Sequence, residues 1–291
     1  MNRYGAYPRK VKIKLIGIHM PEGPEVKIEA DKIANALVGV SMEAVYFEQT
    51  RLKRFGKILT DTKVLSVEAR GKAMVIRFDN ERYLYSHNQL YGRWYVRPRG
   101  EFPATNRTLR VALHGAEHSG LLYSASEIAV LSEPALNEHP YIKKLGPNPL
   151  DDALSWQDFV ARIKAKRFQN RSLGALYLDQ AFIAGIGNYL RSEILFRAGL
   201  DPERSPKSLS TTEISRLARA TVTLTRRAYL TKGITNPAGR VRELKKQGHK
   251  RGGYRFAVFD RAAEPCYECG QTITRLSLNG RRLYFCNVCQ K

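Results

Sequence analysis

Two spacings of apolar residues divide the first half of the chain. After Pro24, small and aliphatic side chains recur three or four positions apart as far as Gly39, which predicts an amphipathic helix that ends at the glycine. From about Ser41 to His118, short runs rich in Val, Ile, Tyr and Phe recur at intervals near ten residues, which predicts the strands of a β-sandwich. The expected strands cover 63–69, 73–78, 82–87, 93–98 and 109–115.

The second half has helical spacing. A proline-rich stretch over 137–152 predicts a linker, and the basic, glycine-bearing segment 239–255 predicts a mobile loop. Ser210 and Glu213 form a capping-box pattern. The expected helices are Trp156–Lys164, Ser172–Gln180, Asn188–Ala198 and Thr211–Leu230. We therefore expect an α+β fold with an extension over 1–19, a β-sandwich domain over 20–145, a helical domain over 150–240 and a cysteine module over 255–291.

The cysteine module has the spacing of a metal site. All four cysteines form two C-x-x-C pairs separated by sixteen residues, which is typical of tetrahedral zinc and argues against a disulfide framework. Asn279-Gly280 predicts a hairpin turn, whose tip presents Arg281 and Arg282 either to a phosphate or to solvent. With no open ligand position, one zinc would be structural. The expected ligands are Cys266, Cys269, Cys286 and Cys289.

The charge composition indicates what kind of partner the chain binds. The chain has 49 Lys and Arg against 27 Asp and Glu, a formal net charge of +22, which favours a polyanion such as nucleic acid. The alternatives are an ordinary basic protein, or a membrane-surface protein, for which a long basic amphipathic helix is missing. No run of apolar residues is long enough to cross a membrane, and no feature indicates an oligomer, so we expect a monomer.

Small residues precede the helix predicted to start at Asn188. The stretch 181–187 joins two helices, which predicts a helix–two-turn–helix arrangement. Its glycines let a backbone approach closely, so the first amides of the helix could bind a phosphate, with Asn188 as the cap. The same residues are equally typical of an ordinary helix entrance.

The stretch Met20-Pro21-Glu22-Gly23-Pro24-Glu25 raises the question of where the active protein begins. At a chain end, the secondary amine of Pro21 would lie near a helix N-terminus, which lowers its pKa and leaves more free nucleophile. That amine could attack a sugar C1′, with Glu22 moving the proton. An amide bond to Met20 blocks this chemistry. We expect residues 1–19 to be a misassigned start or, second, a cleaved presequence; a strand-like extension is the other interpretation.

Five motifs, in order along the chain from Met20 to Lys291, resemble the formamidopyrimidine-DNA glycosylase/endonuclease VIII family. YSHNQLYG resembles the endonuclease VIII branch rather than the oxidised-purine branch. The motifs are MPEGPEV at 20–26, EARGKA at 68–73, YSHNQLYGRW at 85–94, LDQAFIAGIGNYLRSEIL at 178–195 and the paired C-x-x-C hairpin.

This resemblance implies a bifunctional DNA glycosylase and AP lyase that removes oxidised pyrimidines and cuts the strand by β,δ-elimination. It makes Pro21 the nucleophile that forms a Schiff base with C1′, and Glu22 the acid/base that helps to open the sugar. Lys72 would assist base loss and β-elimination and contact phosphate. Asn188 and Arg281 would grip the phosphates that flank the lesion, and Arg281 would also take part in δ-elimination.

The resemblance also implies the DNA contacts and the setting. Gln89, Leu90 and Tyr91 would enter the duplex and fill the gap left by a flipped base. Lys144 stands where the family carries a basic DNA contact, here as Lys rather than Arg. The partner would be double-stranded DNA with damaged bases or abasic sites, and the place the bacterial cytoplasm, associated with the nucleoid.

Three alternatives stay open at this point. The first is a glycosylase for oxidised purines such as 8-oxoguanine or formamidopyrimidine, which YSHNQLYG disfavours. The second is a damaged-DNA binder without catalysis, which applies if Pro21 is internal in the mature protein. The third is an RNA-binding zinc protein, which fits the charge and leaves MPEGPE and Lys72 unexplained.

Overall fold

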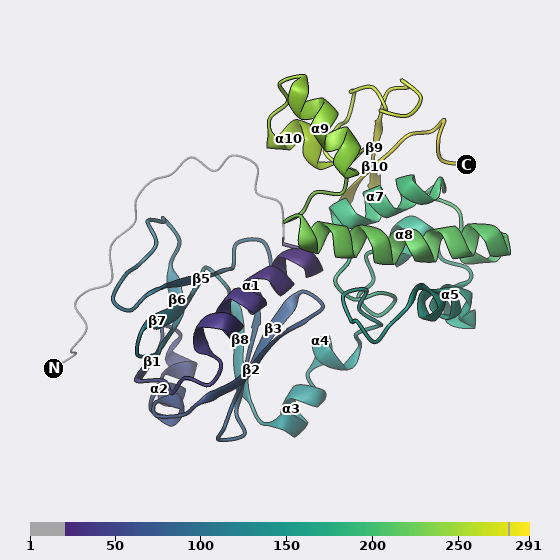
Figure 1. Cartoon of the computed structure of the whole chain (residues 1–291). Coiled ribbons are helices and arrows are strands. Elements are labelled where there is room, and N and C mark those ends of the chain that lie inside the picture. The colour runs from purple at the N-terminus through teal and green to yellow at the C-terminus, as the bar shows by residue number, and fades with distance from the viewer. Residues whose placement is uncertain (1–20, 279) are drawn as a thin grey trace. The chain divides into compact units, whose positions relative to one another are not determined.

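A computed structural model describes residues 21–278 and 280–291 (Figure 1). These residues form two compact units, the first with Pro21 and 26–143, the second with 22–25 and 144–291. The first residues of helix α1 (Gly23–Leu37), as far as Glu25, belong to the second unit, and the remaining residues belong to the first. The extension over 1–19, Met20 and the turn residue Asn279 lie outside the described residues.

The first unit is a β-sandwich. Its described residues form two four-stranded antiparallel sheets, ordered β1-β6-β7-β5 and β2-β3-β4-β8. The five strands predicted from the sequence are confirmed as β2 to β6. The bounds are β1 (Ala44–Phe47), β2 (Val64–Arg70), β3 (Ala73–Phe78), β4 (Tyr83–His87), β5 (Arg93–Pro98), β6 (Leu109–His114), β7 (His118–Tyr123) and β8 (Glu127–Leu131).

The predicted first helix is confirmed, and its apolar stripe explains its position. Val26, Ile33 and Leu37 of α1 are buried in the same core as strand residues of both sheets. Burying an aliphatic side chain of this size contributes roughly 1.5–3 kcal/mol, so the stripe fixes the helix against the sandwich. The chain leaves the helix at Gly39, whose φ of 81° is one that glycine adopts without strain.

Two sequence predictions for this unit are wrong. The region expected to hold only strands contains α2 (Lys53–Leu59), because Gly56 lets the helix approach Val45 so closely that a Cβ would lie 2.8 Å from its carbonyl oxygen. The expected linker is preceded by α3 (Glu133–Asn137) and contains α4 (Pro140–Lys143). Pro140 starts α4 at a position where its missing N–H costs nothing, so proline there marks a helix start.

The second unit is helical and ends in a hairpin. The predicted helices α5 (Trp156–Lys164), α7 (Asn188–Ala198) and α8 (Thr211–Leu230) are confirmed, together with the capping box of Ser210 and Glu213. The helix expected over Ser172–Gln180 is a single turn, α6 (Leu173–Leu176). Beyond it, the N–H groups of Leu178 and Asp179 donate to the Ala175 and Leu176 carbonyls three residues back, which is the bonding of tight turns and not of an α-helix. The other bounds are α9 (Ala238–Lys246), α10 (Arg251–Arg255), β9 (Thr274–Leu278) and β10 (Arg281–Phe285).

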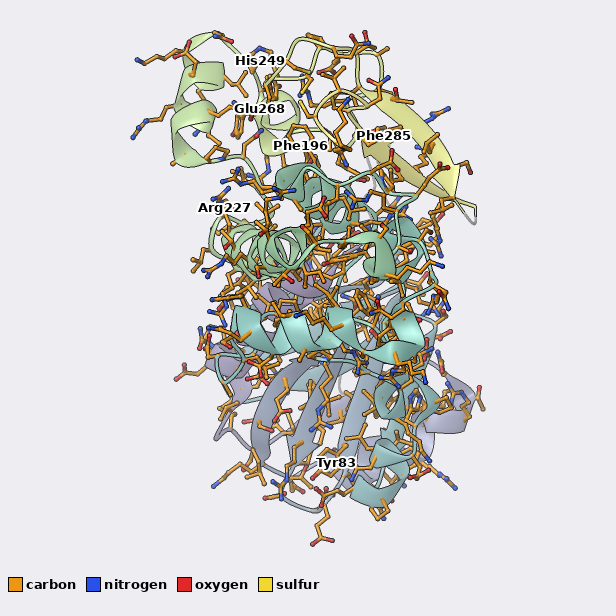
Figure 2. The ribbon with its side chains drawn as sticks, turned by 90° about the vertical axis from the view of Figure 1, so that its right-hand side faces the viewer. Tyr83, Phe196, Arg227, His249, Glu268 and Phe285 are labelled. Carbon is orange, nitrogen blue, oxygen red and sulfur yellow. The ribbon has the colours of Figure 1, made fainter. Side chains whose placement is uncertain are left out.

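The basic segment predicted as a mobile loop is instead helical, as α9 and α10. Side chains between the first two cysteines hold it. Glu268, labelled in Figure 2, pairs with Arg240 at 2.7 Å, and the Tyr267 hydroxyl donates to the Gly253 carbonyl at 2.8 Å. The Arg261 guanidinium lies 3.4 Å from the centre of the Tyr267 ring. The cysteine module therefore supports the basic segment, and local sequence gave no sign of this contact.

Helix α7 is the centre of the second unit. Two of its charged side chains are buried and pin distant backbone: Arg191 donates to the Gly174 and Arg282 carbonyls, both at 2.9 Å, and Glu193 accepts N–H groups of residues 257–259 at 2.8–2.9 Å. Helices and hairpin therefore share one hydrophobic core. Within the described residues, every helix is too short or too polar to cross a membrane.

Candidate active site

Glu22 carries the most constrained carboxylate of the MPEGPE stretch. It is 3% exposed and lies at the start of α7, within the second unit. Its Oε2 accepts the N–H of Gly187 at 2.7 Å and of Leu190 at 3.2 Å, and its Oε1 accepts the N–H of Tyr189 at 2.8 Å. A helix leaves these amides unpaired, and its dipole favours a negative charge there. The carboxylate is therefore held in one orientation by α7.

This contact corrects two sequence interpretations. The first amides of α7 were expected to bind a phosphate, and they bond Glu22 instead. Asn188 was expected to cap the helix, whereas the cap is Gly187 and Asn188 is the first helical residue, half-buried. Asn188 thus keeps its place at the entrance of α7 and loses its predicted role as the cap.

Glycines explain why two distant motifs meet here. A Cβ on Gly187 would lie 2.5 Å from the Glu22 carboxyl carbon, so a larger residue here would displace the carboxylate. The Gly23 N–H donates to the Gly185 carbonyl at 2.8 Å, and a Cβ on Gly23 would lie 3.0 Å from the Gly185 Cα. The two sequence stretches are therefore built to pack on each other.

Glu25 forms the second part of this site. Its carboxylate accepts the Tyr189 hydroxyl at 3.0 Å, the Arg255 guanidinium at 3.1 Å and the Glu22 backbone N–H at 3.2 Å. Burial raises the pKa of Glu25, and the charge of Arg255 opposes that rise. Tyr189 and Arg255 were missed by sequence reasoning. Arg255 lies in the segment expected to be a mobile loop, and a tyrosine in an apolar helix carries no distinguishing signal.

Pro21 is half-buried and directly precedes Glu22. In the 291-residue chain its nitrogen is part of the peptide bond to Met20, so it carries no basic lone pair. The same position at a chain end would place a secondary amine one residue from a fixed carboxylate. The amine and the carboxylate therefore form a catalytic pair only if Pro21 begins the chain.

Lys72 lies in the first unit, on the two-residue turn between β2 and β3. The turn is possible because Gly71 has a φ of 62°. The Lys72 backbone N–H donates to the Tyr141 hydroxyl at 2.8 Å, and the Tyr141 ring packs edge-on against His87 at 5.0 Å. Burial raises the pKa of Tyr141 to about 12, so its hydroxyl stays neutral and holds the turn.

The segment Asn88–Gly92 between β4 and β5 is a tight turn, called here the wedge turn. The Gly92 N–H donates to the Asn88 carbonyl at 2.6 Å, and a Cβ on Gly92 would lie 2.5 Å from that oxygen. Leu90 and Tyr91 are 37% and 52% exposed, large apolar side chains presented to solvent. Exposed apolar groups on a short turn are typical of a surface that contacts a partner.

Gln89 has a different part in the wedge turn. Its φ is 49°, and both ends of its amide are engaged, Oε1 accepting the Ser126 hydroxyl at 2.7 Å and Nε2 donating to Glu127 at 3.2 Å. Its backbone N–H donates to the His87 ring at 3.1 Å. In this structure, therefore, Gln89 braces the turn, and Leu90 and Tyr91 are the side chains that project.

The other predicted DNA contacts lie in the second unit. Arg281 is exposed at the first position of β10, and Lys144 is exposed at the beginning of the unit. Buried Arg191 of α7 bonds the Arg282 carbonyl, so the helix that carries Asn188 and the strand that carries Arg281 are fastened together. Lys72 and the wedge turn belong to the first unit.

The four cysteines form the predicted metal centre. All four Sγ atoms lie within 4.8 Å of one another, with Cys269 and Cys286 3.4 Å apart and Cys266 and Cys289 3.9 Å apart. A tetrahedron with zinc–sulfur bonds near 2.3 Å has sulfur atoms about 3.8 Å apart. The cluster therefore fits one zinc ion, which would tie the hairpin to the segment that follows α10.

Comparison with known proteins covers almost the whole chain. Three family models match: the formamidopyrimidine-DNA glycosylase N-terminal domain at residues 20–125, its H2TH domain at 145–238, and the zinc finger found in FPG and IleRS at 263–291. Endonuclease 8 of Salmonella arizonae is 42% identical over 272 residues, and that of Salmonella heidelberg 41%. Each match covers 94% of this chain and 100% of the relative.

Solved structures agree on the fold. A complex of Lactococcus lactis Fpg with DNA that contains N7-benzyl-Fapy-dG matches with a TM-score of 0.76 at 20% identity, covering 93% of this chain and 100% of that one. A complex of the same protein with DNA that contains an abasic site matches with a TM-score of 0.75 at 21% identity, covering 93% and 99%. The two match the fold at an identity too low to identify a substrate.

Proposed function

This chain belongs to the formamidopyrimidine-DNA glycosylase/endonuclease VIII family and is a DNA glycosylase and AP lyase of base excision repair, and we propose that it removes oxidised pyrimidines through a Schiff base on Pro21. One observation carries this proposal: the Glu22 carboxylate is fixed by three backbone N–H groups, one residue from the nucleophile. A carboxylate held this way acts without first having to be ordered.

The proposed reaction begins when the Pro21 nitrogen bonds to C1′ and the bond from C1′ to the damaged base breaks. Glu22 moves a proton to open the sugar, Lys72 assists base loss, and an iminium forms. Loss of a C2′ proton then expels the 3′ phosphate, and a second elimination, in which Arg281 takes part, expels the 5′ phosphate. Hydrolysis of the remaining imine frees Pro21, and the product is a one-nucleotide gap.

The proposed active form begins at Pro21. The match to the N-terminal domain starts at residue 20, and the endonuclease 8 relatives are covered over their full length, which supports a family protein that lacks residues 1–19. The blocked nitrogen of the longer chain supports the same start, because an amide nitrogen cannot form an iminium. The chain with residues 1–20 attached would bind DNA without catalysis.

We propose that DNA with damaged bases or abasic sites is the partner of this enzyme, which is supported by its endonuclease 8 relatives. In our proposal Leu90 and Tyr91 replace the stacking lost when the damaged nucleotide leaves the helix, with Gln89 at the same gap. Asn188, Arg281 and Lys144 hold phosphates, and the net charge supplies binding that is independent of sequence. One structural zinc held by the four cysteines would stabilise the Arg281 hairpin. We place the enzyme in the bacterial cytoplasm, with the nucleoid.

The oxidised-pyrimidine assignment is supported by relatives that are endonuclease 8 proteins at 41–42% identity and by the YSHNQLYG stretch of the wedge turn. Excision of thymine glycol and of 8-oxoguanine opposite cytosine, measured side by side, tests it. We expect faster removal of thymine glycol. Much faster removal of 8-oxoguanine would move the chain to the oxidised-purine branch.

Borohydride trapping tests the nucleophile. We expect the chain that begins at Pro21 to form a covalent adduct with DNA that contains an abasic site, and the 291-residue chain with Met20 retained to form none. Mass spectrometry of both proteins establishes their first residue, and fluorescence anisotropy checks that both bind the DNA. Equal trapping by an intact 291-residue chain would show that another amine is the nucleophile.

A further inference from the structure

We propose that Glu29 is a positioning residue that holds the base of the wedge turn and so sets where Leu90 and Tyr91 enter DNA. The inference rests on the proposed role of the wedge turn in base flipping. Glu29 takes no part in the proposed chemistry, and it belongs to the first unit together with the turn.

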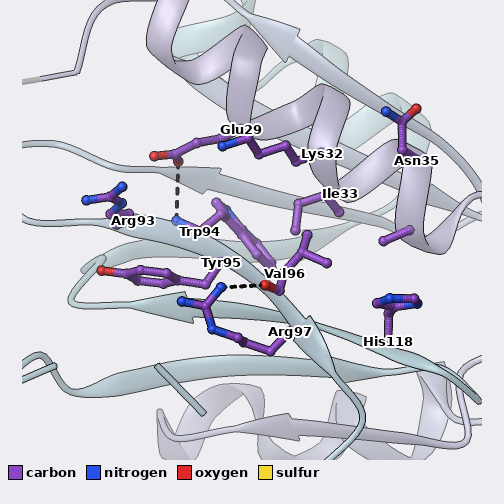
Figure 3. Close-up of a pocket in the computed structure, with 11 residues that line it drawn as sticks. Glu29, Lys32, Ile33, Asn35, Arg93, Trp94, Tyr95, Val96, Arg97 and His118 are labelled. Atoms are coloured by element: carbon purple, nitrogen blue, oxygen red, sulfur yellow. Dashed lines mark hydrogen bonds between the residues drawn. The ribbon is translucent and has the colours of Figure 1, made fainter. Parts of the chain in front are cut away.

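The geometry is a single oxygen that joins both ends of the turn. Glu29 Oε2 accepts the Asn88 side-chain amide at 2.8 Å. The same oxygen accepts the Trp94 backbone N–H at 3.2 Å (Figure 3). Asn88 is the first residue of the turn, and Trp94 is the second residue of β5, just beyond it. The carboxylate therefore spans the residues that project, without touching them.

Glu29 also supplies a hydrogen-bond acceptor that a neighbouring strand would otherwise provide. β5 is at the edge of its sheet, paired with β7 on one side only. An unpaired N–H at a sheet edge must find another acceptor, and for Trp94 that acceptor is Glu29. The strand that follows the wedge turn is thus fastened to α1 through a side chain.

The base of the turn is rigid, and its tip is not covered. Asn88 and Trp94 are 3% and 4% exposed, and the Trp94 indole N–H donates to the Ser86 hydroxyl at 3.1 Å. A displacement of about 1 Å in a group that orders a substrate can lower a rate by roughly 100-fold. A buried, hydrogen-bonded base is therefore the feature that would give Leu90 and Tyr91 a defined place.

Holding this carboxylate costs stability. Glu29 lines a cavity of about 450 Å³ together with Lys32, Arg93 and His118. Burial raises the pKa of Glu29 to about 7, while its hydrogen bonds and the charges of Arg93 and Lys32 act in the opposite direction. A neutral side chain would be easier to bury here, so the carboxylate is better explained by the two donors that it holds.

The test uses the zinc-loaded form of the chain that traps DNA with borohydride. Glu29→Ala is compared with two controls. Glu29→Gln keeps an acceptor oxygen. Asp31→Ala removes another carboxylate of the same helix, one that pairs with Lys27. Single-turnover excision is measured on a lesion in duplex DNA, and strand cleavage on an abasic site in single-stranded DNA, where no base pair has to be broken. Thermal unfolding is recorded for each variant.

We expect Glu29→Ala to lose roughly 10- to 100-fold on the duplex lesion and less than about twofold on the single-stranded abasic site, with Glu29→Gln and Asp31→Ala close to wild type. Equal losses on the two substrates, or no loss on the duplex, would overturn the inference. A further variant, Leu90→Ala, shows whether a negative result concerns Glu29 alone or the proposed role of the wedge turn. If Leu90→Ala is impaired on duplex DNA and Glu29→Ala is not, Glu29 has no positioning role; if neither is impaired, the proposed role of the wedge turn is wrong.

Discussion

The wedge turn and the entrance of α7 are two bends of similar construction, but their apolar residues lie in different surroundings. Each contains a glycine on which a Cβ would lie 2.5 Å from another atom, and each is held by a glutamate. Glu22 accepts three backbone N–H groups, and Glu29 accepts one backbone N–H and one side-chain amide. At the α7 entrance the colliding atom belongs to that glutamate, Glu22. At the wedge turn it is the Asn88 carbonyl oxygen, part of the turn itself.

The difference lies in what each bend does with its apolar residues. Ile183 and Ile186 at the α7 entrance are fully buried, whereas Leu90 and Tyr91 on the wedge turn are exposed. Burial contributes to stability, and exposure leaves apolar surface available to a partner. One bend therefore fixes the proposed acid/base Glu22 inside the protein, while the other presents Leu90 and Tyr91, the proposed DNA contacts, on a buried base.

The largest expected effect is on chemistry at the α7 entrance. In the chain that begins at Pro21, Glu22→Gln keeps an oxygen that can accept from the α7 amides and loses the capacity to move a proton. We expect base excision to fall by roughly 10²–10⁴-fold, with binding to DNA retained. Single-turnover excision and anisotropy measure the two quantities. A loss as small as the roughly tenfold loss that we expect for Leu90→Ala would show that Glu22 is a structural cap only.

The next effect compares the two glycines by stability. Gly92→Ala forces a methyl group against the backbone of Asn88, which is 3% exposed, and we expect a loss of about 2–4 kcal/mol in the free energy of unfolding. Gly187→Ala meets the far end of the Glu22 side chain, which can shift at the expense of its hydrogen bonds, so we expect a loss of about 1–2 kcal/mol. Urea unfolding of the zinc-loaded proteins gives both values. A larger cost at Gly187 would reverse the ranking of the two bends.

A smaller effect depends on pH. The pKa of Glu29 is raised from 4.5 to about 7, so between these values the folded protein keeps a proton that the unfolded chain has released. The free energy of unfolding therefore falls as pH rises from about 4.5 to 7, and the cost is complete above 7. Glu29→Gln lacks this titration, and we expect it to exceed wild type by up to about 3 kcal/mol at pH 8 and to approach it near pH 4.5. An advantage equal at pH 5 and pH 8 would contradict this assignment.

The smallest effect is on the brace of the wedge turn. Gln89→Ala removes exposed hydrogen bonds to Ser126 and Glu127, and we expect less than about 1 kcal/mol in stability and only a few-fold in duplex excision. Ser126→Ala is the matched control, because it removes one of these bonds and keeps Gln89. A loss with Gln89→Ala as large as with Leu90→Ala would mean that Gln89 itself enters the DNA.

Local patterns predicted the elements that depend on local residues. The apolar stripe from Val26 to Leu37 predicted α1, and the runs rich in β-branched residues predicted β2 to β6. The cysteine spacing predicted a cluster that fits zinc. Sequence reasoning failed where a tertiary contact decides. α9 and α10 are ordered by Tyr267 and Glu268, and nothing within the basic segment itself reports those partners.

The site was predictable as a set of residues and not as a set of contacts. MPEGPE and the glycines of 184–187 both stand out in the sequence, but their contact joins residues more than 160 positions apart. One signal was available: Arg191 and Glu193 interrupt a stretch that is apolar on all sides, and charges in such a place must find buried partners. Glu29 gave no signal, because a glutamate on an amphipathic helix is usually solvated.

The anchoring of Glu22 in α7 sets a limit on how the chain end could be processed. A protease that stopped before Pro21 would leave the carboxylate in place. One that removed two residues more would strip the amides of Gly187, Tyr189 and Leu190 of their acceptor. Over-trimmed protein would then be recognisable by a loosened helical unit as well as by lost activity, so accurate maturation and correct folding would be checked by the same side chain.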